Sequence, residues 1–237
     1  MMKYRIFFLI CFLCLVSWMQ AKTYIVCVGV SDYPGTNMDL RVSASDAKTI
    51  YKIFRKNGNS VAVSLTDSLA TSSQMSLVLD SLFSKAKAED VVIFYFSGHG
   101  FPGGLFFYDT PIYYEQIFNI IKSSNALNKV IFADACYSGK MRKEDAKKDQ
   151  SITDTNVMFF LSSRSQERSS ETIFNNSLFT LYLERALRGG ADYNRDRIIT
   201  ARELYDFVHQ GVEKESLGFQ HPVMWGKFDS NMPIIKW

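Results

Sequence analysis

The feature that most constrains the fold of this chain is a repeated alternation of short apolar runs with amphipathic helical stretches. Residues 24–30 (YIVCVGV) and 90–96 (DVVIFYF) have the nearly continuous apolar character of parallel strands that are covered on both faces. Residues 43–56 instead repeat apolar side chains at i, i+3, i+4 and i+7, as one face of a helix does. By these criteria, strands are predicted at 24–30, 61–65, 90–96, 105–108, 129–133 and 157–161, and helices at 43–56, 73–86, 114–121, 178–187 and 201–208.

This strand–helix–strand order predicts the fold class. Connections between neighbouring parallel strands cross over with one hand, and the helices they carry cover both faces of the sheet. We therefore expect an α/β fold with a mainly parallel central sheet and helices on both faces. The tail from residue 221 contains Pro222, Pro233 and two tryptophans, and no element is assigned to it. Sites in such folds lie at the carboxyl ends of the strands.

The N-terminus predicts export. Lys3 and Arg5 form a basic start, residues 6–18 are an apolar run, and Ala21 is a small residue at a plausible cleavage point. The run is shorter than the roughly 20 apolar residues of a membrane span. Residues 1–21 are therefore predicted to be a secretory signal peptide, with an uncleaved anchor as the alternative. The mature protein would be periplasmic or secreted, without a stable membrane span.

Composition narrows the remaining function classes. The 237 residues carry a formal net charge of +3, which falls to +1 once the two basic residues of the signal are removed. That charge is too small to indicate nucleic-acid binding. Of the four cysteines, Cys27 and Cys136 remain after cleavage. Exported proteins usually oxidise cysteines in pairs, so a disulfide between them and two free thiols are both open.

Two predicted strands end in unusual residues. One runs into Ser97-Gly-His-Gly100 and the other into Asp134-Ala-Cys-Tyr-Ser-Gly139. A thiolate attacks a peptide carbonyl far better than a thiol does, so a nucleophilic cysteine needs a neighbouring base, which histidine supplies near neutral pH. Alone, His99 is most simply a turn residue and Cys136 an inert core residue. Together at two strand ends, they predict nucleophilic catalysis.

These two motifs resemble the catalytic motifs of the caspase-like cysteine peptidases of clan CD, and most closely those of the metacaspase and bacterial caspase-domain group. Further similar segments are Tyr33-Pro-Gly35, Ser45-Asp-Ala47, Phe160-Leu-Ser-Ser163, Ser177-Leu-Phe-Thr180 and Glu203-Leu-Tyr-Asp206. The resemblance implies a caspase-like three-layer sandwich spanning 22–237. Its large part would be about 22–140 and its small part about 157–237, with the polar stretch 140–156 as an exposed loop.

The resemblance also implies a role for each matching position. His99 would be the general acid and base, and Cys136 the nucleophile that forms a thioacyl-enzyme. The backbone N–H groups of Gly100 and Cys136 would form the oxyanion hole. The resemblance thus implies an endopeptidase that acts on polypeptides and whose chemistry requires no cofactor. Two alternatives are a catalytically silent caspase-like binding module and a transpeptidase that uses the same dyad. The sequence does not indicate an oligomeric state.

Acidic residues suggest the substrate preference. Asp134 lies two residues before Cys136, so both side chains should face the same side of the strand end. A buried carboxylate is costly unless paired, and a substrate Arg or Lys would pair it. The resemblance places Asp46 in the same pocket, although Ser43-Ala-Ser-Asp46 also fits a helix capping box. We therefore expect cleavage after Arg or Lys.

Basic residues in the predicted loop suggest self-cleavage. The resemblance implies that the corresponding loop is where such enzymes separate their large and small parts. The candidate positions, between about 140 and 148, are Arg142, Lys143, Lys147 and Lys148.

One further segment resembles a calcium loop. Asp192, Asn194, Asp196 and Glu203 occupy positions 1, 3, 5 and 12 of an EF-hand pattern. Position 6, which should be glycine, is arginine. The alternative is a structural turn followed by the capping box Thr200-Ala-Arg-Glu203. Calcium is therefore the one metal that the sequence suggests.

Overall fold

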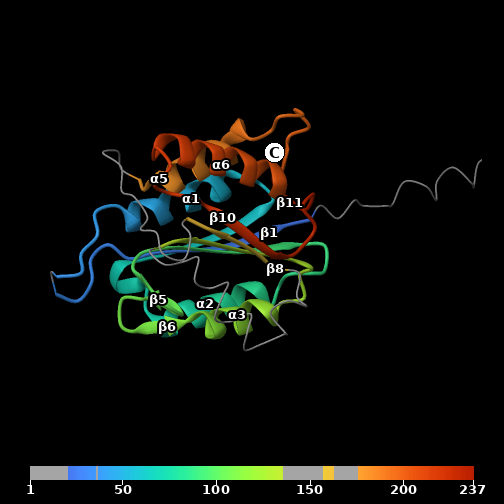
Figure 1. Ribbon diagram of the computed structural model, residues 1–237. Coiled ribbons are helices and arrows are strands. Elements are labelled where there is room, and N and C mark those ends of the chain that lie inside the picture. The colour runs from blue at the N-terminus through green and yellow to red at the C-terminus, as the bar shows by residue number, and fades with distance from the viewer. Residues whose placement is uncertain (1–20, 36, 136–156, 163–175) are drawn as a thin grey trace, which may run out of the picture.

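The computed structural model describes residues 21–35, 37–135, 157–162 and 176–237. Within them, six strands form one central sheet in the order β10-β8-β7-β3-β1-β2 (Figure 1). These strands are β1 (Thr23–Gly29), β2 (Ser60–Thr66), β3 (Val91–Ser97), β7 (Asn128–Asp134), β8 (Val157–Leu161) and β10 (Val223–Lys227). All neighbours are parallel except β10, which runs antiparallel to β8 at the edge. The predicted mainly parallel sheet is confirmed.

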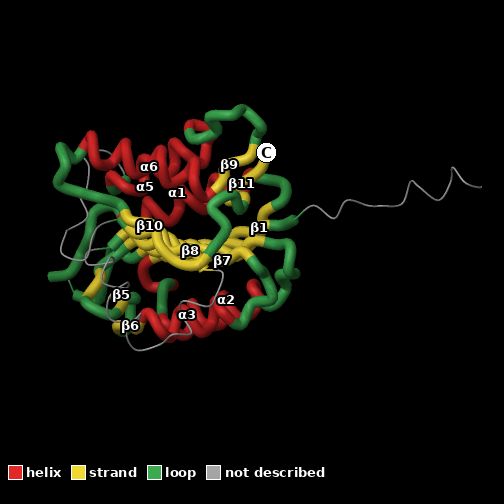
Figure 2. The backbone as a smooth tube through the Cα atoms, turned by 45° about the vertical axis from the view of Figure 1, so that its right-hand side comes forward, coloured by secondary structure: helices red, strands yellow, loops and turns green. Residues whose placement is uncertain are grey.

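Helices cover both faces of this sheet. One layer holds α1 (Ser43–Lys56), α5 (Leu178–Arg185) and α6 (Ala201–Glu215), and the opposite layer holds α2 (Ser72–Phe83) and α3 (Tyr114–Lys122), as Figures 1 and 2 show. The smaller elements are η1 (Asp67–Leu69), η4 (Ala186–Gly190), the sheet of β4 (Gly100–Phe101), β5 (Gly104–Phe106) and β6 (Pro111–Tyr113), and the pair β9 (Ile198–Thr200) and β11 (Pro233–Lys236). The result is a three-layer α/β sandwich.

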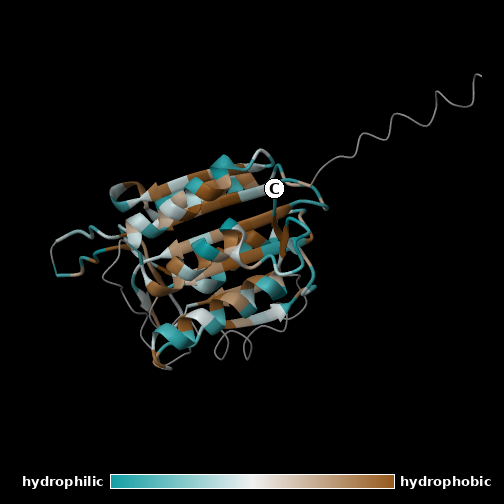
Figure 3. Ribbon diagram, turned by 90° about the horizontal axis from the view of Figure 1, so that it is seen from above, coloured by the Kyte–Doolittle hydropathy of each residue, from teal (hydrophilic) through white to brown (hydrophobic). Residues whose placement is uncertain are grey.

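Alternation along the strands divides the core into two halves. On β1, Tyr24, Val26 and Val28 pack in the half that faces α2 and α3, whereas Ile25 and Cys27 pack in the half that faces α1, α5 and α6. Both faces of β1 are therefore buried, which explains its continuous apolar sequence. The helices are apolar on one side only, and hydrophilic and hydrophobic bands alternate along them in Figure 3.

Cys27 is a free, fully buried thiol. The disulfide that the sequence left open is therefore absent. Burial raises the pKa of the Cys27 thiol well above its usual value. A thiol held protonated in this way is unreactive. Of the two cysteines in the proposed mature chain, only Cys136 is left for chemistry.

Several predicted boundaries are corrected. The helix predicted at 73–86 ends at Phe83, and the strand predicted at 105–108 is the shorter β5. The helix predicted at 201–208 continues to Glu215. Gly211 does not end it, because a Cβ there would lie 2.2 Å from the Tyr182 ring. Glycine at this position instead allows α6 to pack closely against α5.

No element was assigned from the sequence to the proline-containing tail, and the structure adds two strands there. The tail forms both β10 and β11. Trp225 of β10 stacks on Phe159 of β8 with 4.2 Å between ring centroids and 7° between ring planes. Pro222 precedes β10, and Pro233 is the first residue of β11, where a missing N–H is tolerated. Pairing with distant strands thus overrides the local signal.

The predicted signal segment, except Ala21, lies outside the described residues, so its cleavage stays a prediction. In the part of the chain that the structure describes, no helix has both the length and the apolar character needed to cross a membrane.

Candidate active site

The register of the central sheet brings the two unusual strand ends to one edge. Strands β3 and β7 are neighbours, and Ser97 lies directly opposite Asp134. His99 follows Ser97 by two residues, as Cys136 follows Asp134 in the sequence. Cys136 itself lies outside the described residues, which stop at Ala135 in this segment. The site is therefore described from the histidine and the surrounding carboxylates.

The His99 ring is oriented by a backbone carbonyl. Its Nε2 lies 2.8 Å from the carbonyl oxygen of Met38, in the loop between β1 and α1. A carbonyl oxygen can only accept a hydrogen bond, so Nε2 carries the proton and donates it. In the neutral ring, Nδ1 is then the unprotonated nitrogen. The arrangement leaves Nδ1 as the nitrogen that can accept a proton.

Tyr33 holds the backbone of His99. Its hydroxyl accepts the His99 N–H at 3.0 Å and donates to the Phe106 carbonyl at 3.0 Å. The two rings also contact each other, with centroids 5.2 Å apart. Burial raises the pKa of Tyr33, which keeps the hydroxyl protonated and able to donate. Asp39 accepts the Tyr33 N–H, so the loop that carries Met38 is tied to the same residue.

The N–H of Gly100 lies outside the β4–β5 ladder. Phe106 donates its N–H to the His99 carbonyl, and Gly100 pairs with Leu105 at the next position. Hydrogen-bonded and non-hydrogen-bonded pairs alternate in antiparallel strands, so the Gly100 pair is of the second kind. Its N–H is thus left to a different acceptor, as an oxyanion-hole donor requires.

Two buried carboxylates lie beside the end of β3. Asp46, on α1, has no exposed surface, and Asp134 is 4% exposed. Asp46 accepts hydrogen bonds from the Ser97 hydroxyl at 2.9 Å, the Asn176 amide at 2.9 Å and the Ser177 N–H at 3.0 Å. Asp134 accepts from the hydroxyls of Ser177 and Thr180.

Except for Ser97, which ends β3, these donors lie at the beginning of α5, where Ser177 is the N-cap. The N-terminal end of a helix carries partial positive charge and stabilises nearby anions.

Burial raises both carboxyl pKa values, and the charge of Asp134 adds to the rise at Asp46. The pKa of Asp46 is raised from 3.8 to about 8, first by burial and then by the charge of Asp134, against the lowering effect of its hydrogen bonds. The pKa of Asp134 is also raised, again mainly by burial. A buried pair of acids whose pKa values are raised in this way holds a proton near neutral pH. A cation placed between them would displace that proton.

Capping does not explain Asp46. The N-cap of α1 is Val42, without a side-chain capping bond, and the Asp46 carboxylate is bonded to Ser97, Asn176 and Ser177 instead. The structure therefore removes the capping-box alternative for Ser43-Ala-Ser-Asp46. It brings Asp46 and Asp134 together around the same α5 terminus, and their role in a substrate pocket stays a prediction.

The calcium-like loop forms an internally bonded turn. Asp192 accepts the N–H groups of Asp196 and Arg197, and Asp196 accepts that of Ile198. Glu203 forms the capping box of α6 with Thr200. Among the residues with described positions, no group of three or more His, Cys, Asp or Glu side chains is arranged to hold a metal. Calcium binding by Asp192, Asn194, Asp196 and Glu203 stays a prediction.

The proposed self-cleavage positions fall outside the described residues. They are Arg142, Lys143, Lys147 and Lys148.

Comparison with known proteins agrees with this geometry. The family model of the caspase domain matches residues 22–232. The chain belongs to the caspase domain family. That family is one of cysteine peptidases, whose substrates are polypeptides, so the resemblance stated from the two motifs is confirmed at the level of the family.

A solved structure supports the fold independently. The chain is similar to the crystal structure of protein GSU0716 from Geobacter sulfurreducens, with a TM-score of 0.68 and 14% identity. The match covers 88% of this chain and 95% of that chain. At this identity the similarity concerns the fold, and the caspase-like sandwich is confirmed. A comparison with curated proteins finds no match.

Sequence reasoning missed several groups around the caspase-type histidine. Tyr33 was noted only as part of a similar segment, and Asn176 was not singled out. The Met38 carbonyl has no sequence signature, because every residue carries one. A sequence signal does exist for Ser177 and Thr180, whose spacing is that of an N-cap and its N3 residue.

Proposed function

We propose that the chain is an exported cysteine endopeptidase of the metacaspase type, which uses Cys136 and His99 to cleave polypeptides after Arg or Lys. The observation that carries this proposal is the bond from His99 Nε2 to the Met38 carbonyl. It leaves Nδ1 as the free base at the sheet edge where the chain continues from Asp134 toward Cys136. Membership in a peptidase family supports the same chemistry.

The proposed reaction needs only groups of this chain. Nδ1 of His99 accepts the proton of the Cys136 thiol, and the thiolate attacks the substrate carbonyl carbon. The developing oxyanion accepts hydrogen bonds from the N–H groups of Gly100 and Cys136. The imidazolium then protonates the leaving amine, and the peptide C–N bond breaks to leave a thioester. Water, deprotonated by Nδ1, hydrolyses the thioester and restores the thiol.

Charge supports a basic residue before the scissile bond. Asp46 and Asp134 are two acids with raised pKa values beside the strand end that carries His99. Binding a guanidinium or ammonium group would convert their repulsion into attraction and release the shared proton. A substrate aspartate at this position would instead add a further negative charge.

Fluorogenic peptides that end in Arg, Lys or Asp test the activity. We expect turnover of the Arg and Lys peptides, loss of turnover by at least about a thousandfold in Cys136→Ala and His99→Ala, and no turnover of the Asp peptide. Asp134→Asn should lower kcat/KM for the Arg and Lys peptides while the protein stays folded. Hydrolysis that persists in Cys136→Ala would refute the mechanism. Binding without turnover would indicate a silent module, and ligation products a transpeptidase.

Three further parts of the proposal have separate tests. Mass spectrometry of wild type beside Cys136→Ala should find cleavage between residues 140 and 148 in the wild type alone. N-terminal sequencing of protein recovered from the periplasm or medium should begin at Lys22. Assays with added calcium or a chelator, repeated on Asp192→Ala/Asp196→Ala, show whether this metal changes the rate, since the chemistry itself requires none.

A further inference from the structure

A buried carboxylate lies at the amino-terminal edge of the sheet, opposite the candidate active site. Asp90 directly precedes β3 and is 4% exposed. Its two oxygens accept backbone N–H groups, from Lys22 at 2.7 Å and from Lys87 at 2.8 Å. Since β3 extends over seven residues, His99 is roughly 20 Å away. The mechanism proposed above makes no use of this carboxylate.

Both the backbone N–H and the backbone carbonyl of Lys22 form hydrogen bonds. Its N–H donates to Asp90, and its carbonyl accepts the N–H of Val91 at 2.9 Å. Thr23, the next residue, starts β1 and donates its N–H to the Asn59 carbonyl. The nitrogen atom of Lys22 is therefore held beside the Asp90 carboxylate by the start of the sheet itself.

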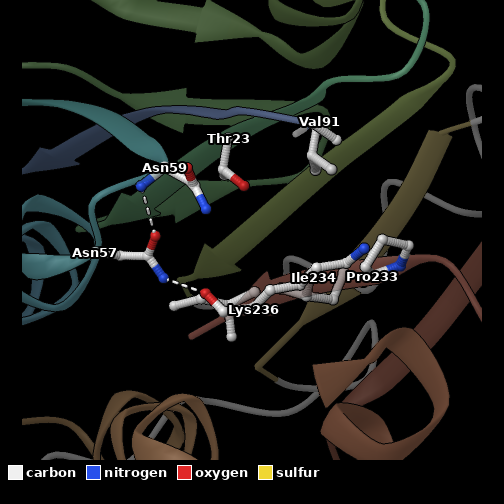
Figure 4. Close-up of a pocket in the computed structure, with 9 residues that line it drawn as sticks. Thr23, Asn57, Asn59, Val91, Pro233, Ile234 and Lys236 are labelled. Atoms are coloured by element: carbon white, nitrogen blue, oxygen red, sulfur yellow. Dashed lines mark hydrogen bonds between the residues drawn. The ribbon is translucent and has the colours of Figure 1, made fainter. Parts of the chain in front are cut away.

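The chain enters the fold at this place beside a shallow pocket, shown in Figure 4. The pocket is lined by Ala21, Thr23, Asn57, Asn59, Val91 and residues 233–236. Asn57 closes its rim with hydrogen bonds to Asn59 and to the Lys236 carbonyl. Because Ala21 lines this pocket, the Ala21–Lys22 peptide bond lies beside it.

Within the described residues, the Asp90 carboxylate forms no ion pair with a basic side chain. A buried carboxylate bonded only to neutral N–H groups is less well compensated than one that faces a cation. The 2.7 Å contact already has the length of a charge-assisted bond.

We propose that Asp90 is the binding site for the α-ammonium group of the mature protein, which signal cleavage creates at Lys22. A signal peptidase hydrolyses the Ala21–Lys22 bond with one water, leaving a carboxylate on Ala21 and an ammonium group on Lys22. The nitrogen atom that donates to Asp90 stays in place and gains a positive charge. Cleavage thereby supplies this carboxylate with a cation and stabilises the exported domain.

The proposed site depends on which peptide bond is cleaved, and not only on whether the signal peptide is removed. If Ala21 remained, the charge would move about 3.8 Å along the chain and Lys22 would keep a neutral N–H. Only cleavage after Ala21 places the positive charge on the Lys22 nitrogen, which lies 2.7 Å from the Asp90 carboxylate.

The ion pair predicts a particular pH dependence. The charged or titratable residues next to it are Lys22 and Lys87, whose backbone N–H groups Asp90 accepts, Glu89, which precedes Asp90 in the chain, and Tyr24, whose pKa the charge of Asp90 helps to raise. Pairing with a carboxylate raises the pKa of an amine. The added stability is therefore fully present below the usual α-amino pKa of about 8 and is lost as pH rises through the higher value of the folded state.

Defined N-termini test the proposal without depending on export. Three proteins in a Cys136→Ala background begin at Lys22, at Ala21, or at Lys22 with an acetylated α-amine, and each is also made with Asp90→Asn. At pH 6.5 we expect the unfolding constant of the Lys22 protein to be about tenfold smaller than those of the other two. The difference should disappear above pH 10 and in Asp90→Asn.

A second readout serves if Asp90→Asn does not fold. NMR titration of the ¹⁵N-labelled amine should place the pKa of the Lys22 α-amine about one unit above that of an unfolded peptide. Equal unfolding constants for the three termini, or an α-amine that titrates as in the peptide, would overturn the proposal. The proposal rests on export with cleavage after Ala21, which N-terminal sequencing tests separately. Peptidase activity is a third, independent measurement.

Discussion

Asp46→Asn isolates the charge of the buried acid pair. Asparagine has the same shape as aspartate, and its Oδ1 can still accept from Asn176 and from the N–H of Ser177. Its Nδ2 takes the place of the other carboxylate oxygen and can donate to the Ser97 hydroxyl. The substitution therefore removes the negative charge and the titration while it keeps the packing.

The raised pKa of Asp46 determines the sign and the magnitude of the pH dependence of the unfolding free energy. A carboxyl whose pKa rises from 3.8 to about 8 on folding favours the folded state in its protonated form. Its contribution is fully present below pH 3.8 and is lost as pH rises through about 8. Between pH 6 and pH 9 this amounts to about 3 kcal/mol of unfolding free energy. Whole domains have about 5–15 kcal/mol, so the loss is large.

Urea unfolding at pH 6, 7, 8 and 9 measures this effect. In a Cys136→Ala background, we expect the free energy of unfolding to fall by about 3 kcal/mol across the range, and Asp46→Asn to be flatter by that amount. At pH 9 the variant should be the more stable protein. Asp80→Asn, which removes an exposed carboxylate on α2, is the control and should follow the parent. Parallel profiles for the parent and Asp46→Asn would refute the reasoning.

Three further substitutions test the site and the fold. Tyr33→Phe removes the hydroxyl that holds His99, and we expect kcat to fall about tenfold with little change in KM; an unchanged kcat would contradict this role. Arg197→Gly should raise the unfolding free energy by about 0.5–1 kcal/mol in urea, because residue 197 has a φ of 64°, and a decrease would contradict it. Gly226→Ala should lower it by about 2–3 kcal/mol, since a Cβ there would lie 2.0 Å from a carbonyl oxygen; Gly58→Ala, with open space around it, is the control and should change little.

Much of the fold could be predicted from local sequence. The helix predicted at 43–56 has those bounds in the structure, and β8 matches the prediction at 157–161. Amphipathic spacing and doubly buried apolar runs are local signals, and they also fix the α/β order of the chain. The motif at His99 and the acid at Asp134 were visible for a related reason, since sites gather at the carboxyl ends of parallel strands.

Only the tertiary structure decided how the site is held. The hydrogen bonds of Asp46 come from Asn176 and Ser177, about 130 residues away, so no local pattern distinguished a cap from a pocket acid. The partner of His99 is a carbonyl that every residue possesses. The strand at 223–227 likewise depends on β8 for its partner. Sequence alone thus predicted most of the helices and strands, because these follow from local periodicity, and it singled out the candidate residues through short motifs at strand ends. The structure alone determined their partners, because those contacts join distant segments.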